Sequence, residues 1–437
     1  MMKSFFIFLC FFSAQVFAQS FDEIDLIKKF DDVYSNAKSY WNYDSYLMHY
    51  GTAEQINDNQ CQLGSSFAPA LDGLLIMYET TKDFRYLEEF MQQAIKVQNS
   101  RSDKITPQFS NSIYWCSGSR FYMNARILWP LAHFVYIIQS DSLLAENKIE
   151  SNSHKGFSSC GEFANYLNQA NKEVMDFFMN HYWMGDECMW KPDQIDDVYS
   201  KMKSPKIMEL NMQASFGCAL IYMYLSNLER VDYGKKAVQM AEKYLKGKTK
   251  NKFGWDTKKK VLEYDETLNA YIWQHSGWRK DLNKYKEDIG HAAFDITFPI
   301  LYNKYQEQFA SITSEKYFTY YEMVRFNNTF IKLIAKDYKL SRSFTYTVDG
   351  NYTDFYYGEN LSQPASGCKE AFNSNAKNWI ELSEFDQSDA ESIDGYIVAY
   401  YMEIEQYKKI GIDGYRPEGI DIRGLANLVK IQKANKD

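Results

Sequence analysis

The feature that most constrains this fold is a helical hairpin that recurs along the chain. Residues 68–97 and 214–245 share one order: small residues and a glycine, an apolar helix, a short polar turn and a second helix. The glycines are Gly73 and Gly217, and a third pair of helices is expected over 291–336. A hairpin of this kind cannot bury its apolar face alone, so repeated hairpins stack in an array or a closed ring. The sequence therefore predicts an all-α protein.

Two connections between these hairpins carry further information. Residues 251–267 alternate in the manner of a small β-hairpin with lysines near its turn. Residues 341–375 are rich in Ser, Asn, Gly and Tyr and are longer than ordinary loops, which predicts a functional loop, with disorder as the competing interpretation. Because no low-complexity linker interrupts the pattern, we expect residues 19–437 to form a single domain.

The first 18 residues have the pattern of a secretory signal peptide. One Lys precedes an apolar run from Phe5 to Phe12, and small residues lead to an expected cleavage after Ala18. No later window approaches the roughly 18 uninterrupted apolar residues that a membrane helix needs. We therefore expect a secreted or periplasmic protein without a membrane span.

Charge and cysteine content narrow the partners and the compartment. The net charge of -8 gives no electrostatic basis for binding nucleic acid. In an oxidising compartment the six cysteines that follow residue 18 could form up to three disulfides, or remain in part as buried thiols. No CxxC spacing occurs, so we expect no structural zinc site. These cysteines are Cys61, Cys116, Cys160, Cys188, Cys218 and Cys368.

The alternating apolar helices, the "YETTKDFRYLEEF" type of turn and the aromatic loops resemble those of (α/α) toroid carbohydrate-active enzymes. These include glycoside hydrolases, polysaccharide lyases and glucuronyl C5-epimerases. The resemblance covers most of residues 60–410 and is clearest in residues 210–225 and 287–302. It implies an (α/α)5-6 toroid of helical hairpins, with the β-hairpin as an insertion, and a glycan or polysaccharide substrate. The chain matches no diagnostic catalytic motif of any one family, so the resemblance does not select a reaction.

The segment "KEDIGHAAFD" contains the strongest catalytic candidates. If a helix begins near Ile289, then Asp288, His291 and Asp295 lie on one face of it. A carboxylate beside an imidazole fixes the tautomer and raises the basicity of the ring, which suits a general base or acid. The competing interpretation is that Asp288 caps the helix and His291 packs in the core, and the two roles are compatible. Two carboxylates and one His without a second cluster predict no metal site.

The residues before this segment are aromatic and charged. Sugar rings stack their C–H faces on aromatic rings, and their hydroxyl groups need fixed polar partners. The same tryptophans could instead pack in the core. We predict substrate contacts from Trp273, His275, Trp278 and Arg279, and catalytic carboxylates at Glu263 and Glu266.

Several polar residues in apolar helices are further candidates. Asn211 and Gln213 open an otherwise apolar helix, and Asp72 interrupts another. We predict that these three bind substrate, although helix capping explains Asn211 equally well. If the substrate is a uronic acid, an embedded arginine suits its carboxylate through a bidentate pair. The embedded arginines are Arg120, Arg126 and Arg325.

The expected function is cleavage of a polysaccharide or glycan fragment, with no cofactor. A lyase or epimerase needs a base such as His291 or a Tyr to remove the proton beside a uronate carboxylate. The lyase-type reaction is slightly favoured. A hydrolase needs two carboxylates, and a non-catalytic glycan- or peptide-binding protein would fit the same features. The GxSxG, P-loop, HExxH and Rossmann patterns do not occur. The hydrolase candidates are Asp288, Asp295, Glu263, Glu266 and Asp72.

Overall fold

Most of the residues that the computed structural model describes are helical, which confirms the predicted all-α class. His275, Trp278, Arg279, the predicted signal peptide and most of the 341–375 connection lie outside the described residues. The described residues are 26–40, 63–105, 113–116, 123–149, 156–183, 210–251, 254–273, 286–336, 345, 347–350, 377–385 and 419–434.

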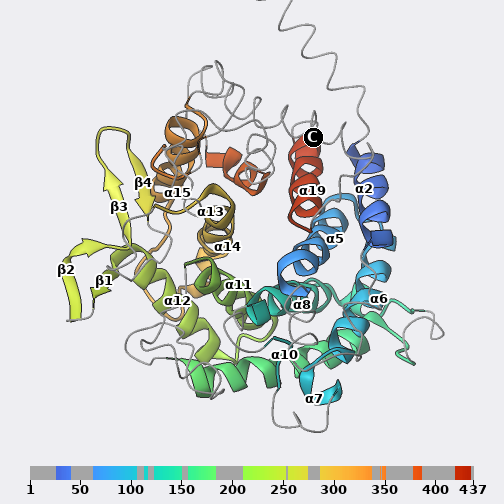
Figure 1. Ribbon diagram of the computed structural model, residues 1–437. Coiled ribbons are helices and arrows are strands. Elements are labelled where there is room, and N and C mark those ends of the chain that lie inside the picture. The colour runs from blue at the N-terminus through green and yellow to red at the C-terminus, as the bar shows by residue number, and fades with distance from the viewer. Residues whose placement is uncertain are drawn as a thin grey trace, which may run out of the picture.

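Five helices form the central layer, and most of their residues are buried. They are apolar on nearly every side, as expected of helices that other helices surround. In Figure 1, α5 packs between α19 and α8, and α8 packs against α11, which in turn contacts α14. These helices are α5 (Ala68–Thr81), α8 (Met123–Gln139), α11 (Leu210–Ser226), α14 (Thr297–Lys304) and α19 (Gly419–Ala434).

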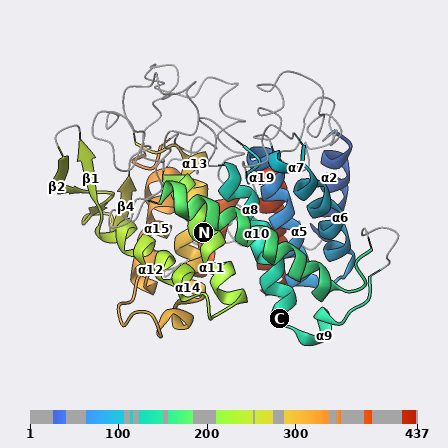
Figure 2. The ribbon, with the colours of Figure 1, turned by 90° about the horizontal axis from the view of Figure 1, so that it is seen from below.

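Peripheral helices cover the central ones. Each is amphipathic and buries one face: in α6, the buried residues Leu87, Phe90, Met91 and Ala94 follow the i, i+3, i+4, i+7 spacing of one helix face. In the view from below, α10 and α12 lie on the outer side of α8 and α11 (Figure 2). Similarly, α6 packs on α5, and α2 packs on α19. These helices are α2 (Leu26–Tyr40), α6 (Arg85–Asn99), α10 (Cys160–Tyr182) and α12 (Val231–Lys246), with short helices α7 (Ser102–Ile105) and α9 (Ser142–Ala145) between them.

The third predicted pair of helices is more broken than the first two. The first member divides into α13 (Ile289–Asp295) and α14, and a 3-10 turn η5 (Gln306–Phe309) leads to α15 (Tyr320–Asn328) and a π-helical turn η6 (Thr329–Ile334). A 3-10 helix, η7 (Lys377–Phe385), contacts both α15 and α19. A short π-helical turn, η1 (Leu63–Phe67), precedes α5.

The matching glycines of the hairpins lie where central elements approach closely. A Cβ atom at Gly217 would lie 2.4 Å from Cδ2 of Phe298 in α14, which no side chain can occupy without moving that ring. At Gly73, the added atom would lie 3.3 Å from the backbone of Arg423 in α19. The small residues that define the repeat therefore permit the close packing of the central helices.

A clasp of polar side chains joins neighbouring peripheral helices. Tyr86 of α6 donates to Asp31 of α2 at 2.9 Å. Arg85 donates to the same carboxylate at 2.7 Å and lies over the Tyr86 ring, 4.8 Å from its centroid. The exposed ion pair contributes little to stability by itself.

The same clasp recurs in the second hairpin. Tyr233 of α12 donates to Asp176 of α10 at 2.8 Å. Arg230 donates to Asp176 at 3.2 Å and lies 3.8 Å from the centroid of the Tyr233 ring. The repetition seen in the sequence thus extends to contacts between hairpins.

The β-structure differs from the single hairpin expected over 251–267. There are two antiparallel pairs, and Asp265 of the second begins a turn by accepting hydrogen bonds from the N–H groups of Thr267 and Leu268. The turn carries the chain back to Trp273, six residues beyond the expected end. The strands are β1 (Lys248–Asn251) with β2 (Gly254–Lys260), and β3 (Leu262–Asp265) with β4 (Ala270–Trp273).

Two of the cysteines are buried free thiols, Cys160 and Cys218. This agrees with the expectation that some of the six cysteines remain as buried thiols. The predicted disulfides stay a prediction. No helix within the described ranges is long and apolar enough to cross a membrane.

Candidate functional site

Asp288 both caps α13 and holds His291. One carboxylate oxygen, Oδ1, accepts from the backbone N–H groups of Gly290 and His291, each at 2.9 Å, which confirms the predicted cap. The other oxygen, Oδ2, lies 2.5 Å from Nδ1 of the His291 ring. An ionised carboxylate can only accept, so Nδ1 carries a proton, and in the neutral ring Nε2 is the basic nitrogen. The His291 side chain is 32% exposed, so this pair has the arrangement of a general base.

The backbone on both sides anchors this pair. Glu287 donates its N–H to the Trp273 carbonyl of β4 at 3.1 Å and accepts from Val348 N–H at 2.9 Å. Asp288 forms an isolated antiparallel bridge with Thr347. The cap therefore rests between two other segments of backbone, which fixes the orientation of His291.

Asp295 and Trp273 form a buried pair. Trp273 Nε1 donates to Asp295 Oδ2 at 2.6 Å, and the two residues are 0% and 1% exposed. Trp379 stacks on Trp273 with ring centroids 6.1 Å apart. Trp273 therefore packs in the core, which was the alternative to substrate stacking, and its indole N–H is satisfied by the buried carboxylate of Asp295.

The other predicted residues are spread over the molecule. Glu263 on β3 accepts from Lys286 at 2.9 Å, and Glu266 lies exposed in the turn between β3 and β4. Gln213 is buried in α11. Asn211 lies in the first turn of α11, and its side chain is outside the described part of the structure.

Asp72 belongs to a buried ionic network among the central elements. It accepts from Arg423 of α19 at 2.8 Å and lies 2.9 Å from Nδ1 of His133 in α8. Arg423 also donates to both oxygens of Glu381 in η7, at 2.7 and 3.1 Å. The other ring nitrogen of His133 lies 3.3 Å from Glu79, near the end of α5. Five alternating charged groups therefore connect α5, α8, α19 and η7.

The charged neighbours within this network shift the pKa values of its members. Burial opposes the charged form of Asp72, but His133 and Arg423 outweigh it and hold the pKa of Asp72 below its ordinary value. Burial also opposes protonation of His133, while Glu79 and Asp72 reverse this and raise its pKa. Despite burial, His133 lowers the pKa of Glu79 to about 2. The two carboxylates beside its ring nitrogens thus favour the protonated form of His133, and the ring of Tyr222 stacks on it with the ring centroids 4.2 Å apart.

This network makes the stability of the fold depend on pH. A raised pKa in His133 stabilises the folded state fully below the ordinary value of 6.5, and the contribution is lost as the pH rises through the raised value. The stabilisation that comes from the lowered pKa of Glu79 is present above pH 4.5 and is lost as the pH falls towards 2. We expect the difference in melting temperature between wild type and His133→Gln to be largest below pH 6.5 and to shrink as the pH rises through the raised pKa of His133. A difference that grows as the pH rises past 6.5 would contradict a charged His133.

Glu287, Asp288 and His291 are also the described group that could hold a metal ion. One ligand atom from each lies within 4.8 Å of the others. The Nδ1 proton of His291 is already donated to Asp288, and a metal ion at that nitrogen would have to displace it. The hydrogen bond thus favours an Asp–His dyad over a metal site.

Comparison with known proteins gives no relative to guide the assignment. No protein-family model matches the chain, no curated protein matches it, and no solved structure matches it.

Proposed function

We propose that this protein is an exported (α/α) toroid enzyme that acts on uronic acid-containing glycans, with His291 as its general base. The packing order supports the toroid: α5 contacts α8, α8 contacts α11, α11 contacts α14, and α15, η7 and α19 lead back to α5. A ring of paired helices would bury every apolar face without leaving an end uncovered.

The observation that carries the proposal is the hydrogen bond between Asp288 and His291. It leaves Nε2 basic on a partly exposed ring at the start of α13. In a lyase reaction Nε2 removes the proton beside the uronate carboxylate. The freed electron pair forms a C=C bond, and the glycosidic oxygen leaves and is protonated. In an epimerase reaction a proton returns to the same carbon from the opposite face.

The hydrolase alternative is less well supported, because three of its acidic candidates have other partners. Asp295 accepts from the Trp273 indole, Asp72 is paired with two cations, and Glu263 is paired with Lys286. Glu287 is adjacent to the dyad but is 0% exposed, so it is poorly placed to reach a sugar. A hydrolase needs two carboxylates that both reach the scissile bond.

The test is a panel of uronate-containing and neutral glycans incubated with the purified protein. We expect absorbance near 232 nm to rise on a uronate glycan as the unsaturated product forms, or solvent deuterium to enter the uronate ring if the reaction is epimerisation. New reducing ends without this absorbance would indicate the hydrolase. Binding without any product would indicate a glycan-binding protein, and either result would overturn the proposed reaction.

Treatment with a chelator distinguishes an Asp288–His291 dyad from a metal site. Because the Asp288–His291 hydrogen bond occupies the nitrogen that a metal would use, EDTA is expected to leave the rate on the active glycan unchanged. The measurement is the initial rate before and after EDTA treatment, followed by addition of Ca²⁺ or Zn²⁺. Loss of activity that one of these ions restores would assign Glu287, Asp288 and His291 to a metal.

A further inference from the structure

An arginine of α8 lies close to the helix that carries the dyad. The guanidinium carbon of Arg126 is 3.9 Å from the centroid of the Phe294 ring. Phe294 follows His291 by three residues in α13, so the two side chains lie on the same face, one helical turn apart. Arg126 is 6% exposed and Phe294 is also 6% exposed. The buried charge of Arg126 therefore contacts α13 about one helical turn away from His291, the proposed base.

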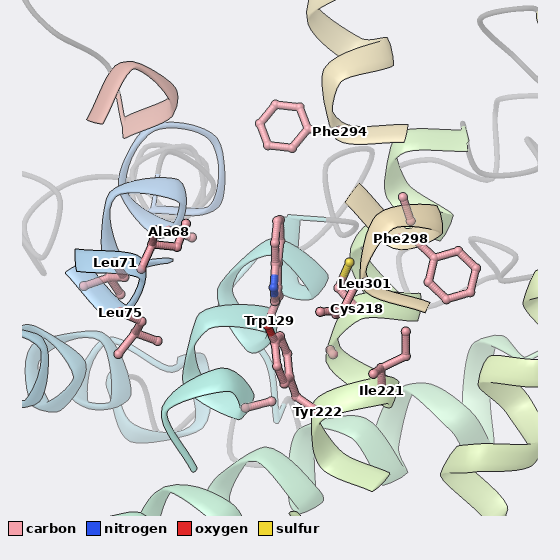
Figure 3. Close-up of a cluster of buried hydrophobic side chains, with 14 of the residues drawn as sticks. Ala68, Leu71, Leu75, Trp129, Cys218, Ile221, Tyr222, Phe294, Phe298 and Leu301 are labelled. Atoms are coloured by element: carbon pink, nitrogen blue, oxygen red, sulfur yellow. The ribbon is translucent and has the colours of Figure 1, made fainter. Parts of the chain in front are cut away.

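One turn further along α8, Trp129 has an indole N–H with no acceptor among the residues that the structure describes. Its side chain is 4% exposed and lies between α5 on one side and α11 and α14 on the other, with Phe294 nearby (Figure 3). A buried donor without an acceptor is costly, and native structures rarely keep one without a reason.

The other deeply buried tryptophans show what is normal in this protein. Each is 0% exposed and each donates its indole N–H to an acceptor within 3.1 Å. Arg423 lies 4.9 Å from the centroid of the Trp129 ring, and its own two carboxylate partners, Asp72 and Glu381, both accept from it. The paired tryptophans are Trp115, Trp273 and Trp379, with acceptors on Val97, Asp295 and Ile289.

We propose that Arg126 and Trp129 form the subsite for the uronate carboxylate, with Phe294 as its apolar wall. A guanidinium and an indole N–H are both donors, and a carboxylate provides acceptors for both. Phe294 connects this subsite to the face of α13 that carries His291, so the carboxylate would be held near the carbon from which the proton leaves. This inference rests on the proposed function and names the residues that would select an acidic over a neutral sugar.

The test compares binding of the methyl glycosides of glucuronate and galacturonate with binding of their neutral counterparts, by ligand-observed NMR on the full chain. Arg126→Met keeps an apolar contact with Phe294 but removes the charge. We expect it to weaken uronate binding at least tenfold and to leave neutral-sugar binding unchanged. Trp129→Phe keeps a ring but removes the N–H, and we expect a several-fold loss for the uronates.

Matched controls exist elsewhere in the chain. Arg230→Met removes an arginine that stacks on Tyr233 at 3.8 Å in the peripheral layer. Trp115→Phe removes an indole N–H that already has an acceptor. Both should retain the preference for uronates. If Arg126→Met does not fold, Arg126→Lys, which keeps the charge but loses the fork of donors, should weaken uronate binding to a lesser degree.

The outcomes separate this subsite from the proposed reaction. In one outcome Arg126→Met removes a preference for uronates, but the wild type turns over no glycan. That outcome would support the subsite and overturn the reaction. Turnover with an unchanged KM for acidic glycans in both Arg126→Met and Trp129→Phe would support the reaction and overturn the subsite. Absence of any uronate preference in the wild type would also overturn the subsite.

Discussion

Replacing Arg423 by Met is expected to lower the free energy of unfolding by about 3–5 kcal/mol. Arg423 is 3% exposed and is the shared cation between Asp72 and Glu381. Without it, the buried Asp72 and the largely buried Glu381 lose their shared cation, and the desolvation of both carboxylates remains. The measurement is denaturation by urea or guanidinium, followed by circular dichroism.

The control is Arg85→Met in the peripheral clasp, which is exposed and should cost at most about 1 kcal/mol. A triple variant, Asp72→Asn with Glu381→Gln and Arg423→Met, should recover part of the lost stability, because the uncompensated charges are then absent. A loss of less than about 1 kcal/mol for Arg423→Met alone would contradict the role given to the network.

Replacing His291 by Ala is expected to lower kcat/KM on the active glycan by about 10²- to 10⁴-fold, the usual contribution of a positioned general base. The ring is partly exposed at a helix start, so its removal should change stability by at most about 1 kcal/mol. The measurement is the initial rate of product formation together with a melting curve. His181→Ala removes another described histidine, in α10, and should leave the rate unchanged.

Asp288→Asn separates the cap from the catalytic role of Asp288. Asn is as good an N-cap as Asp, so α13 should keep its start. The amide N–H₂ can donate to Nδ1 of His291, which would place the ring proton on Nε2 and remove the base. We expect near-normal stability with a rate close to that of His291→Ala. A normal rate in Asp288→Asn would show that the carboxylate only caps the helix.

Local patterns predicted the parts of this molecule that depend on neighbours in the sequence. The helical hairpins follow from apolar residues at helical spacing, and the matching Gly73 and Gly217 mark real close approaches. The cap at Asp288 and its contact with His291 also follow from residues three apart. The β-pairs extended further than expected because the turn after Asp265 was not recognised.

Interactions between distant residues could not be predicted in this way. Asp72 stood out as a charge within an apolar helix, but its partner Arg423 is 351 positions away. His133 lies in a helix that is otherwise almost entirely apolar, so nothing in its own segment indicated a paired role. The polar residues around Trp273 in the sequence favour a sugar-binding role. In the structure Trp273 is buried, and its indole N–H donates to Asp295 from another element.

In the proposed reaction His291, held by Asp288, removes a proton from a uronate ring. The most direct measurement is the rise in absorbance near 232 nm on the best glycan of the panel, recorded side by side for the wild type, His291→Ala, Asp288→Asn and His181→Ala. If the reaction is epimerisation, solvent deuterium uptake replaces the absorbance. We expect equal rates for the wild type and His181→Ala, and at least a hundredfold loss in the two dyad variants. A His291→Ala protein that forms product at the wild-type rate would contradict the role of His291 as the base.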